Sequence, residues 1–349
     1  MIFTAAFCLA ALVFFSWSVR NRVLLLLQGA PAVRWDRPGT RVAGMFTYFL
    51  GQRRLFLDPV PGVMHALIFW GFLVLMVATA NFILSAVLPG TRLPFTDGIY
   101  LFFQDLFTVI VAGAVLFALF RRLVRKPERL DNSADAFFIL GLILLLMVTM
   151  LVEQGGVMVS SGGIGPSYRF ASVATARVLG RLPTGTVELL AGLAWLAHFF
   201  AFWTFLCYLP YSKHFHVLGA AFNVFFRDLS PRGEMPKIDL EKTTNFGAAT
   251  LPEFKWKDIL DGFSCVECGR CTAQCPARQS GKHLNPKEMV LALRSFALSR
   301  TEGAQAKAEA TANAEATADA TANIFTRDVP VEDLWSCTTC RACVEHCPI

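Results

Sequence analysis

The chain has few charged residues: Asp, Glu, Lys and Arg make up 17% of its 349 positions, whereas soluble domains carry about 25%. It is instead 54% hydrophobic, and nearly all of the apolar excess lies before residue 226. It also lacks a Cys-x-x-Cys-His string, which excludes covalently attached c-type haem. Its first apolar segment has neither a basic start nor a small-residue cleavage site, which argues against a secretory signal peptide. These absences exclude a simple soluble enzyme and indicate a membrane part followed by a smaller soluble part.

Five segments are long and apolar enough to cross a hydrocarbon core of ~30 Å, which takes about 20 helical residues. They lie near Ile2–Val19, Gly62–Leu88, Gly98–Phe120, Ala134–Val152 and Thr184–Leu209. The loops after the first and third segments are rich in Arg and Lys, whereas the loop after the second carries only Arg92. The positive-inside rule therefore predicts an N-terminus outside and a cytoplasmic location for everything after the fifth span. Topology and lipid headgroups explain the basic loops, so no nucleic-acid partner is expected.

Histidine is scarce, and four of the six histidines belong to the apolar part: His65, His198, His214 and His216. Ionisable residues within a span are rare and usually functional, although a single one is more often a hydrogen-bonded packing residue. His198 and His216 are 18 residues apart, which on a continuous helix places them on one face about 27 Å apart. That spacing suits two stacked haems, for which neutral imidazole is a natural axial ligand.

His65 is expected just inside the cytoplasmic start of the second span, at the depth of His214 or His216. A b-type haem between His65 and His216 is therefore the main prediction. His214 would point almost the opposite way on an unbroken helix, but Pro210 can kink that helix. A second haem at His198 stays open, because its only candidate partner is Met76, and a membrane Met is more often a packing residue.

The soluble part carries two copies of a four-cysteine run. The first is Cys265-Val-Glu-Cys268-Gly-Arg-Cys271-Thr-Ala-Gln-Cys275-Pro, and the second is Cys337-Thr-Thr-Cys340-Arg-Ala-Cys343-Val-Glu-His-Cys347-Pro. This C-x2-C-x2-C-x3-C-P spacing is that of bacterial ferredoxins, in which the fourth Cys ligates the other cluster. The runs therefore predict one [4Fe–4S] cluster on Cys265, Cys268, Cys271 and Cys347, and a second on Cys337, Cys340, Cys343 and Cys275.

Two other uses of these cysteines fit less well. Structural zinc usually spaces two Cys pairs by a dozen or more residues. Disulfides are disfavoured because the predicted topology places the thiols in a reducing cytosol. The remaining cysteines, Cys8 and Cys207, lie in apolar segments and are interpreted as small core residues.

The predicted fold is all-α: a five-helix transmembrane haem b bundle over residues 1–226, a linker over 227–255 and a small helical two-cluster ferredoxin domain over 256–349. Within the last part, Asn285-Pro286 predicts a helix start. Alanine occupies every even position from Ala304 to Ala322, so residues 303–323 are interpreted as a low-complexity insertion, either disordered or weakly helical.

Both parts together resemble the bacterial membrane-bound heterodisulfide-reductase-like Fe–S oxidoreductases. The apolar part with its histidines resembles the cytochrome b of nitrate reductases, their gamma chain, and the cysteine-rich part resembles the two-cluster ferredoxin of heterodisulfide reductases. Three local strings carry this resemblance: Leu209-Pro-Tyr-Ser-Lys-His214-Phe-His216, Asn285-Pro-Lys-Glu-Met-Val and Leu334-Trp-Ser-Cys337-Thr-Thr-Cys340.

The sequence departs from the family's pattern at two places. Leu75 replaces the histidine that would pair with His198, and the family's cysteine-rich CCG domains do not follow Cys347, so a fragment or a separate CCG-domain polypeptide is expected.

The resemblance implies a quinone-linked oxidoreductase, or an electron-transfer subunit of one, in the bacterial inner membrane. Electrons would pass from a soluble cytoplasmic donor, such as electron transfer flavoprotein, through two [4Fe–4S] clusters and haem b to menaquinone. Lys213 and His214 are candidates for the quinone pocket. Two alternatives remain: a quinol-oxidising subunit of a heterodisulfide- or sulfite-reductase-like complex, and an Fe–S protein on a haem-free membrane anchor.

Overall fold

The fold is described by a computed structural model that covers residues 2–163, 165–231, 234, 240–241, 247–310, 323–327 and 329–349. The described part of the chain is helical, and its only β-type pairing is a single parallel bridge between Ala30 and Lys255. This agrees with the all-α fold expected from the sequence. The central residues 311–322 of the predicted low-complexity insertion lie outside the described residues.

Five long helices are each able to cross a membrane by length and composition. They are α1 (Ile2–Leu26), α3 (Pro59–Val87), α4 (Ile99–Phe120), α5 (Ala134–Ser160) and α7 (Thr184–Tyr208). Five long apolar helices at the expected places in the chain are thus confirmed. Two of them run further than predicted, since α1 continues through Arg20 and Arg22 and α5 continues through Glu153. Arg and Glu are good helix formers, so an isolated charge does not end a helix.

The helix that carries His198 does not extend to His216. Helix α7 ends at Tyr208, and two 3-10 turns, Leu209–Tyr211 and Lys213–Phe215, precede α8 (His216–Phe225). Pro210 lies in this break, as its missing N–H and fixed φ lead one to expect. The prediction that His198 and His216 share one face of a continuous helix is therefore wrong. The distance of 27 Å estimated from that helix fails with it.

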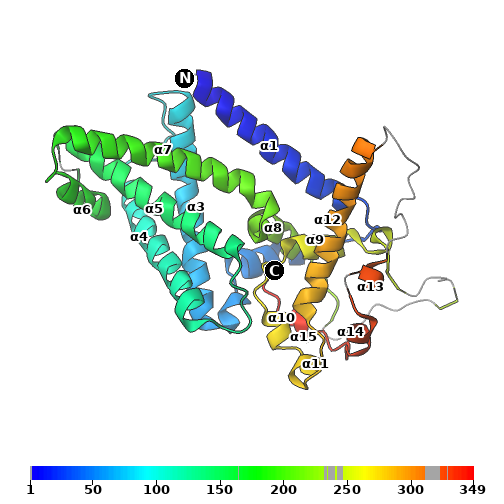
Figure 1. Cartoon of the computed structure of the whole chain (residues 1–349). Coiled ribbons are helices and arrows are strands. Elements are labelled where there is room, and N and C mark those ends of the chain that lie inside the picture. The colour runs from blue at the N-terminus through cyan, green and yellow to red at the C-terminus, as the bar shows by residue number, and fades with distance from the viewer. Residues whose placement is uncertain are drawn as a thin grey trace. The chain divides into compact units, whose positions relative to one another are not determined.

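The chain forms two compact units. The first consists of residues 1–17, 55–127 and 132–212. In it α5 packs along α7, as Figure 1 shows, and also contacts α4 and α6 (Phe170–Leu179), while α3 packs on α4. Small residues permit close approach: a Cβ on Gly155 would lie 2.9 Å from Thr175 of α6, and one on Gly156 would lie 2.7 Å from Ala191 of α7.

The second unit consists of residues 18–54, 128–131 and 213–349. It therefore takes in two loop segments from between the apolar helices. Its elements are α2 (Pro38–Gly44), a π-helix (Met45–Leu50), α8, α9 (Trp256–Ser264), α10 (Arg270–Ala273), α11 (Pro276–Gln279), α12 (Pro286–Ala310), α13 (Ile324–Arg327), α14 (Val331–Trp335) and α15 (Ala342–Glu345). The helix start expected at Asn285-Pro286 is confirmed by α12.

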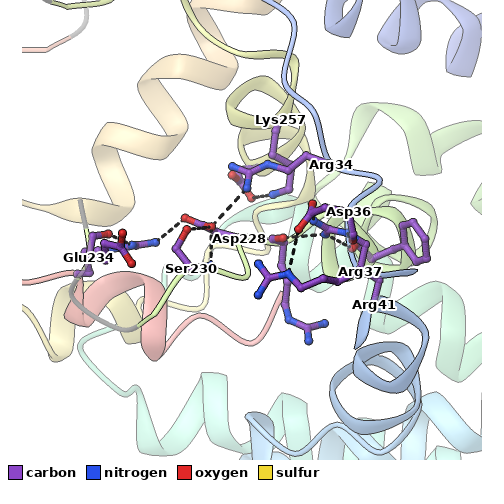
Figure 2. A network of polar contacts seen from close by, with 12 residues as sticks. Arg34, Asp36, Arg37, Arg41, Asp228, Ser230, Glu234 and Lys257 are labelled. Carbon is purple, nitrogen blue, oxygen red and sulfur yellow. Dashed lines mark hydrogen bonds and ion pairs between the residues drawn. The ribbon is translucent and has the colours of Figure 1, made fainter. Parts of the chain in front are cut away.

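A network of arginines joins the loop before α2 to the end of α8 (Figure 2). Arg41 is only 1% exposed, and it donates hydrogen bonds to the backbone oxygens of Phe225 and Arg227 at 2.8 and 2.9 Å. Its guanidinium also pairs with Asp36 at 2.5 Å. A buried charge persists when it is paired and hydrogen-bonded in this way. Arg41 therefore fixes residues 36–41 against the segment that leads to the cysteine-rich part.

Candidate functional site

The two cysteine runs fold into loops with the same backbone conformation. In each loop the residues directly before and directly after the second cysteine have positive φ: Glu267 (58°) and Gly269 (69°) in the first, Thr339 (52°) and Arg341 (60°) in the second. Each loop then enters a one-turn helix, α10 or α15, whose N-cap is the second of those residues. Non-glycine residues rarely adopt φ above zero, so repetition of the pattern shows that the sequence motif encodes a specific loop shape.

Backbone N–H groups point at cysteine sulfurs in both loops. The N–H of Thr339 lies 3.4 Å from Cys337 Sγ, and the N–H of Glu267 hydrogen-bonds to Cys265 at the equivalent position. The N–H of Ala342 lowers the pKa of the exposed Cys340 thiol below its ordinary value. Such N–H groups stabilise a thiolate, the form that binds metal, and hydrogen bonds to sulfur tune cluster potentials.

The last cysteine of the second run lies beside the first loop. Burial, together with the nearby Cys268, Asp261 and Cys265, raises the pKa of Cys347 to about 12. Helices α10 and α15 pack against each other, which accounts for this proximity. Cys343 instead interacts with Cys337 and Cys340 of its own run.

The remaining cysteines occupy distinct surroundings. Cys271 lies near Cys268 and Cys265, and its burial raises its pKa to about 11. Cys275 is 6% exposed and packs with Ala277, Leu284 and Met289. Within the described residues, no three His, Cys, Asp or Glu side chains converge as a ready metal site. The donor set nevertheless fits iron–sulfur clusters chemically, because each run presents three thiols on one loop and a fourth after it, and thiolates are the ligands of such clusters.

Glu267, inside the first loop, accepts two ion pairs that motif analysis did not identify. Arg294 of α12 donates to it at 2.5 Å, and Lys213 lies 3.4 Å away. Burial alone would raise the pKa of Glu267, but the Arg294 hydrogen bond and the charges of Lys213 and Arg294 outweigh it and hold that pKa below its ordinary value. Lys213, considered from sequence as a candidate for the quinone pocket, is therefore a partner of the first cysteine loop.

Arg54 fixes the second run. Its guanidinium donates to the backbone oxygens of Cys347 at 3.0 Å and Val344 at 3.4 Å, while its own backbone oxygen accepts from Arg270 at 2.9 Å. From sequence Arg54 was only one of several basic loop residues. No local signal marks it, because its partners lie more than 200 residues away along the chain.

Asp228 holds the second loop from another side. Arg341 pairs with it at 3.0 Å. Arg34 pairs with it at 3.4 Å, and Ser230 donates to it from both its N–H and its Oγ (Figure 2). Burial alone would raise the pKa of Asp228, but the Ser230 and Arg341 hydrogen bonds and the Arg34 charge hold it well below its ordinary value. Arg341 also donates to the backbone oxygen of Glu234.

The candidate haem histidines are distributed over both units. His65 lies in the second turn of α3 in the first unit, whereas His214 and His216 belong to the second. The ring of His216 is fixed with Nδ1 3.1 Å from the Lys213 backbone oxygen, and burial lowers its pKa below the ordinary value. The His214 ring lies 5.1 Å from it, edge to face. A neutral imidazole oriented by a backbone carbonyl is suited to axial ligation through Nε2.

His198 is buried in the first unit. Its Nδ1 lies 3.0 Å from Thr149 Oγ1, and its ring packs edge to face on Phe82 with centroids 4.9 Å apart. Met76, the proposed partner for a second haem, is 46% exposed on α3. Cys8 and Cys207 both lie in the first unit; Cys8 belongs to an apolar cluster with Phe199 and Trp203, and Cys207 packs against it.

Comparison with known proteins identifies a family for the cysteine-rich part and relatives for most of the chain. Residues 257–348 match the family described as 4Fe-4S dicluster domain, so the chain carries a dicluster domain, and such domains hold two [4Fe–4S] clusters. The probable iron-sulfur-binding oxidoreductase FadF of Bacillus subtilis is 30% identical over 97% of this chain and 52% of its own length. The EtfAB:quinone oxidoreductase of Syntrophomonas wolfei is 29% identical over 90% of this chain and 48% of its own.

A shorter match covers only part of the sequence. An iron-sulfur protein of the CoB--CoM heterodisulfide reductase of Methanopyrus kandleri is 25% identical over 28% of this chain and 36% of its own length. The chain spans about half the length of the first two relatives. No solved structure matches it significantly.

Proposed function

We propose that this chain transfers electrons between a soluble cytoplasmic flavoprotein and menaquinone in the bacterial inner membrane. The observation that carries the proposal is the pair of cysteine loops with the same pattern of positive φ, with Cys347 near Cys268 and Cys265 of the first loop, in a chain that also has five membrane-length apolar helices. The relative named EtfAB:quinone oxidoreductase supports electron transfer flavoprotein as the donor and quinone as the acceptor.

The proposed cluster ligands keep the crossed arrangement. Cys265, Cys268, Cys271 and Cys347 hold the first [4Fe–4S] cluster, and Cys337, Cys340, Cys343 and Cys275 hold the second. The electrostatic grouping of Cys347 with Cys268 and Cys265, apart from Cys337 and Cys340, supports the first set. For the second set, the support is the repeated loop conformation.

Bound clusters and haem supply one-electron carriers, and the protein sets their distance, potential and access. The residues of this chain perform three tasks towards that end. The loop N–H groups stabilise thiolates, Glu267 anchors the first loop to Arg294 and Lys213, and Arg54 and Asp228 anchor the second. These three anchoring residues tie the two loops to other segments of the second unit.

For haem b, we propose His65 and His216 as the axial pair, with His214 as the neighbour of His216. The support is the fixed orientation of the His216 ring and the placement of His65 near the start of α3. The basic loops after α1 and α4 support an N-terminus outside and a cytoplasmic iron–sulfur part.

A second candidate is electron input from quinol into a disulfide-reducing partner. The partial match to an iron-sulfur protein of a heterodisulfide reductase favours it. This candidate function uses the same cluster and haem ligands, but electrons flow in the opposite direction, from quinol to the clusters. The partner that then reduces a disulfide would be a CCG-domain polypeptide. A third candidate is an Fe–S protein on a haem-free membrane anchor. Measurement of the haem content of the purified protein tests it.

Metal and haem analysis of the detergent-purified protein tests the proposal. About eight non-haem irons and at least one b-type haem per chain are expected, and reduced electron transfer flavoprotein should reduce the clusters and then a menaquinone analogue. Cys271→Ser should remove or convert one cluster. Cys207→Ser, a change in a cysteine of α7 outside both loops, should leave the iron content unchanged. Purified protein without iron, or with clusters that the flavoprotein cannot reduce, would contradict the proposal.

A further inference from the structure

The two cysteine loops differ in how far they are open to solvent. Residues 337–340 of the second loop are all exposed, and two of them are cysteines. In the first run, Cys265, Cys268 and Cys271 are half-buried and Cys275 is buried. Because the backbone pattern of the two loops is the same, this difference comes from what packs against each loop.

Other segments of the second unit cover the first loop. Glu267 is held by Arg294 of α12 and by Lys213. Gly269 is buried, and a Cβ on it would lie 2.3 Å from the backbone oxygen of Arg129. A soluble protein therefore approaches the second loop more closely than the first.

An exposed tryptophan adjoins the second loop. Trp335 ends α14, two residues before Cys337, and it is 84% exposed, more than any other of the seven tryptophans. A single exposed apolar side chain is ordinary on a protein surface, but this one lies next to exposed cysteines of a redox motif. Tryptophan is also enriched among the few residues that dominate binding between proteins. Trp335 is therefore suited to be the apolar anchor of a docking site.

The charged groups around this tryptophan are mainly acidic. Glu332 and Asp333 form the acidic first turn of α14, and Glu332 is exposed. The basic residue of the second loop, Arg341, is already paired with Asp228. Thiolate ligands of a cluster add further negative charge. A partner with lysines or arginines around its own redox centre complements this surface, and such complementarity speeds the encounter of two proteins.

The first loop leads towards His216. Lys213 connects the two, because its Nζ lies 3.4 Å from Glu267 Oε2 and its backbone oxygen lies 3.1 Å from His216 Nδ1. One residue therefore contacts both the first loop and the proposed haem ligand. Electron tunnelling falls steeply with distance, so this contact favours the first cluster as the carrier that passes electrons to a haem on His216.

We propose that the soluble flavoprotein docks on the second-loop patch, which consists of Glu332, Asp333, Trp335 and residues 337–340, and that it presents a basic surface there. The inference rests on the proposed function and adds to it the docking surface and the order of the clusters. One electron at a time leaves the reduced flavin of the donor, which is oxidised and loses its proton to water, and enters the second cluster, which is reduced. The electron then passes to the first cluster and on towards His216.

Cross-linking of the purified chain to electron transfer flavoprotein tests the docking surface. A zero-length carbodiimide reagent joins carboxylates to lysines that touch them, and peptide mapping locates the joined residues. Cross-links are expected between flavoprotein lysines and the peptide that carries Glu332 and Asp333. Cross-links confined to other exposed carboxylates, such as Glu128 or Glu288, would overturn the inference. So would a CCG-domain polypeptide or a second copy of this chain that occupies the patch and excludes the flavoprotein.

Binding measurements give a second readout. Trp335→Ala should raise the Kd for the flavoprotein about tenfold, because the apolar anchor is lost, and should leave the iron content unchanged. Glu332→Lys should slow association several-fold at low salt, and added salt should reduce this effect. The control is Glu128→Lys, the same charge change on an exposed residue next to Arg129 of the first-loop contact. Equal effects of the two lysine variants would overturn the assignment of the patch.

A matched pair of variants tests the order of the clusters. Cys340→Ser should remove or convert the second cluster, and Cys268→Ser, at the equivalent position, the first. The flavoprotein should reduce the remaining cluster at the wild-type rate in Cys268→Ser and at least about tenfold more slowly in Cys340→Ser, as followed by freeze-quench electron paramagnetic resonance. Dithionite, which needs no docking surface, shows that the remaining cluster is intact. The reverse pattern would place electron entry at the first loop and overturn the inference.

The two levels of the proposal fail differently. If dithionite reduces the wild-type clusters and the flavoprotein does not, the proposed function is wrong. If the flavoprotein reduces them and binds Trp335→Ala and Glu332→Lys as it binds the wild type, the function stands and the docking surface is wrong.

Discussion

Gly269 and Arg341 occupy equivalent positions in the two cysteine loops and share a left-handed conformation, with φ of 69° and 60°. Their surroundings explain why only one is glycine. A Cβ on Gly269 would lie 2.3 Å from the backbone oxygen of Arg129, whose segment is held by the 2.7 Å ion pair between Asp131 and Lys287. At the other position, Arg341 reaches Asp228 and the ion pair offsets its backbone strain.

Gly269→Ala should destabilise the cysteine-rich unit by more than the ~1–2 kcal/mol that the left-handed conformation costs an L-residue, because the new methyl group meets the Arg129 carbonyl. The matched control is Gly281→Ala, where φ is 87° but a Cβ would meet nothing within 4 Å. Thermal unfolding and iron content measure the effect. Equal losses in the two variants would show that the Arg129 contact is unimportant.

The crossed ligation predicts which cysteine pairs act together. Cys347→Ser and Cys268→Ser should affect the same cluster, so the double variant should keep the other cluster, with about four irons. Combining Cys347→Ser with Cys340→Ser should instead affect both clusters. Iron analysis and electron paramagnetic resonance of the reduced protein distinguish the cases, and the opposite pattern would show that each run holds its own cluster.

Stability should fall at acid pH through Glu267. Its folded pKa lies below its ordinary value, so its contribution is present above the unfolded pKa of about 4.3 and is lost as pH falls through the folded pKa. Glu267→Gln should remove this loss of stability at acid pH. It should also lower the free energy of unfolding at pH 7 by about 1.5–3 kcal/mol, the usual contribution of a hydrogen bond to a charged group. Unfolding followed from pH 7 to pH 3 tests this, with Glu332→Gln on exposed α14 as the control.

Arg54→Ala should loosen the end of the second run, since the backbone oxygens of Cys347 and Val344 lose their donor. We expect faster loss of iron to a chelator, by several-fold. Arg53→Ala is the control: it removes the same charge one residue earlier on an exposed side chain. If both variants lose iron equally, the effect of Arg54 is one of loop charge and not of its hydrogen bonds.

His216→Ala should abolish the reduced-minus-oxidised haem spectrum, because the oriented imidazole is the proposed axial ligand. His65→Ala should do the same. The exposed His283 provides the control, and its replacement by Ala should leave the spectrum intact. Full haem content in His216→Ala would reject the assignment and return His214 to consideration.

Local patterns in the sequence were enough to predict the five long helices, the start of α12 and the set of clustered cysteines. Apolar runs of membrane length predict the five long helices, because a segment in a hydrocarbon core must satisfy its own backbone hydrogen bonds and a helix does so. The spacing of Cys265–Cys271 and Cys337–Cys343 predicts two equivalent loops, and the repeated φ pattern confirms that they are equivalent. The crossed role of Cys347 followed from the motif and remains a prediction.

Other features depend on contacts between distant segments, which carry no period or motif. The break after Tyr208 separates His198 from His216, although a helical count had joined them. The partners of Glu267, Arg54 and Gly269 come from other parts of the chain. Burying a polar group costs free energy unless a hydrogen-bonding or charged partner lies beside it. Tertiary packing decides which residue that partner is. The sequence by itself thus determined the five long helices and the two cysteine loops, because apolar runs and motif spacing are local, and tertiary structure alone decided which side chains meet around them.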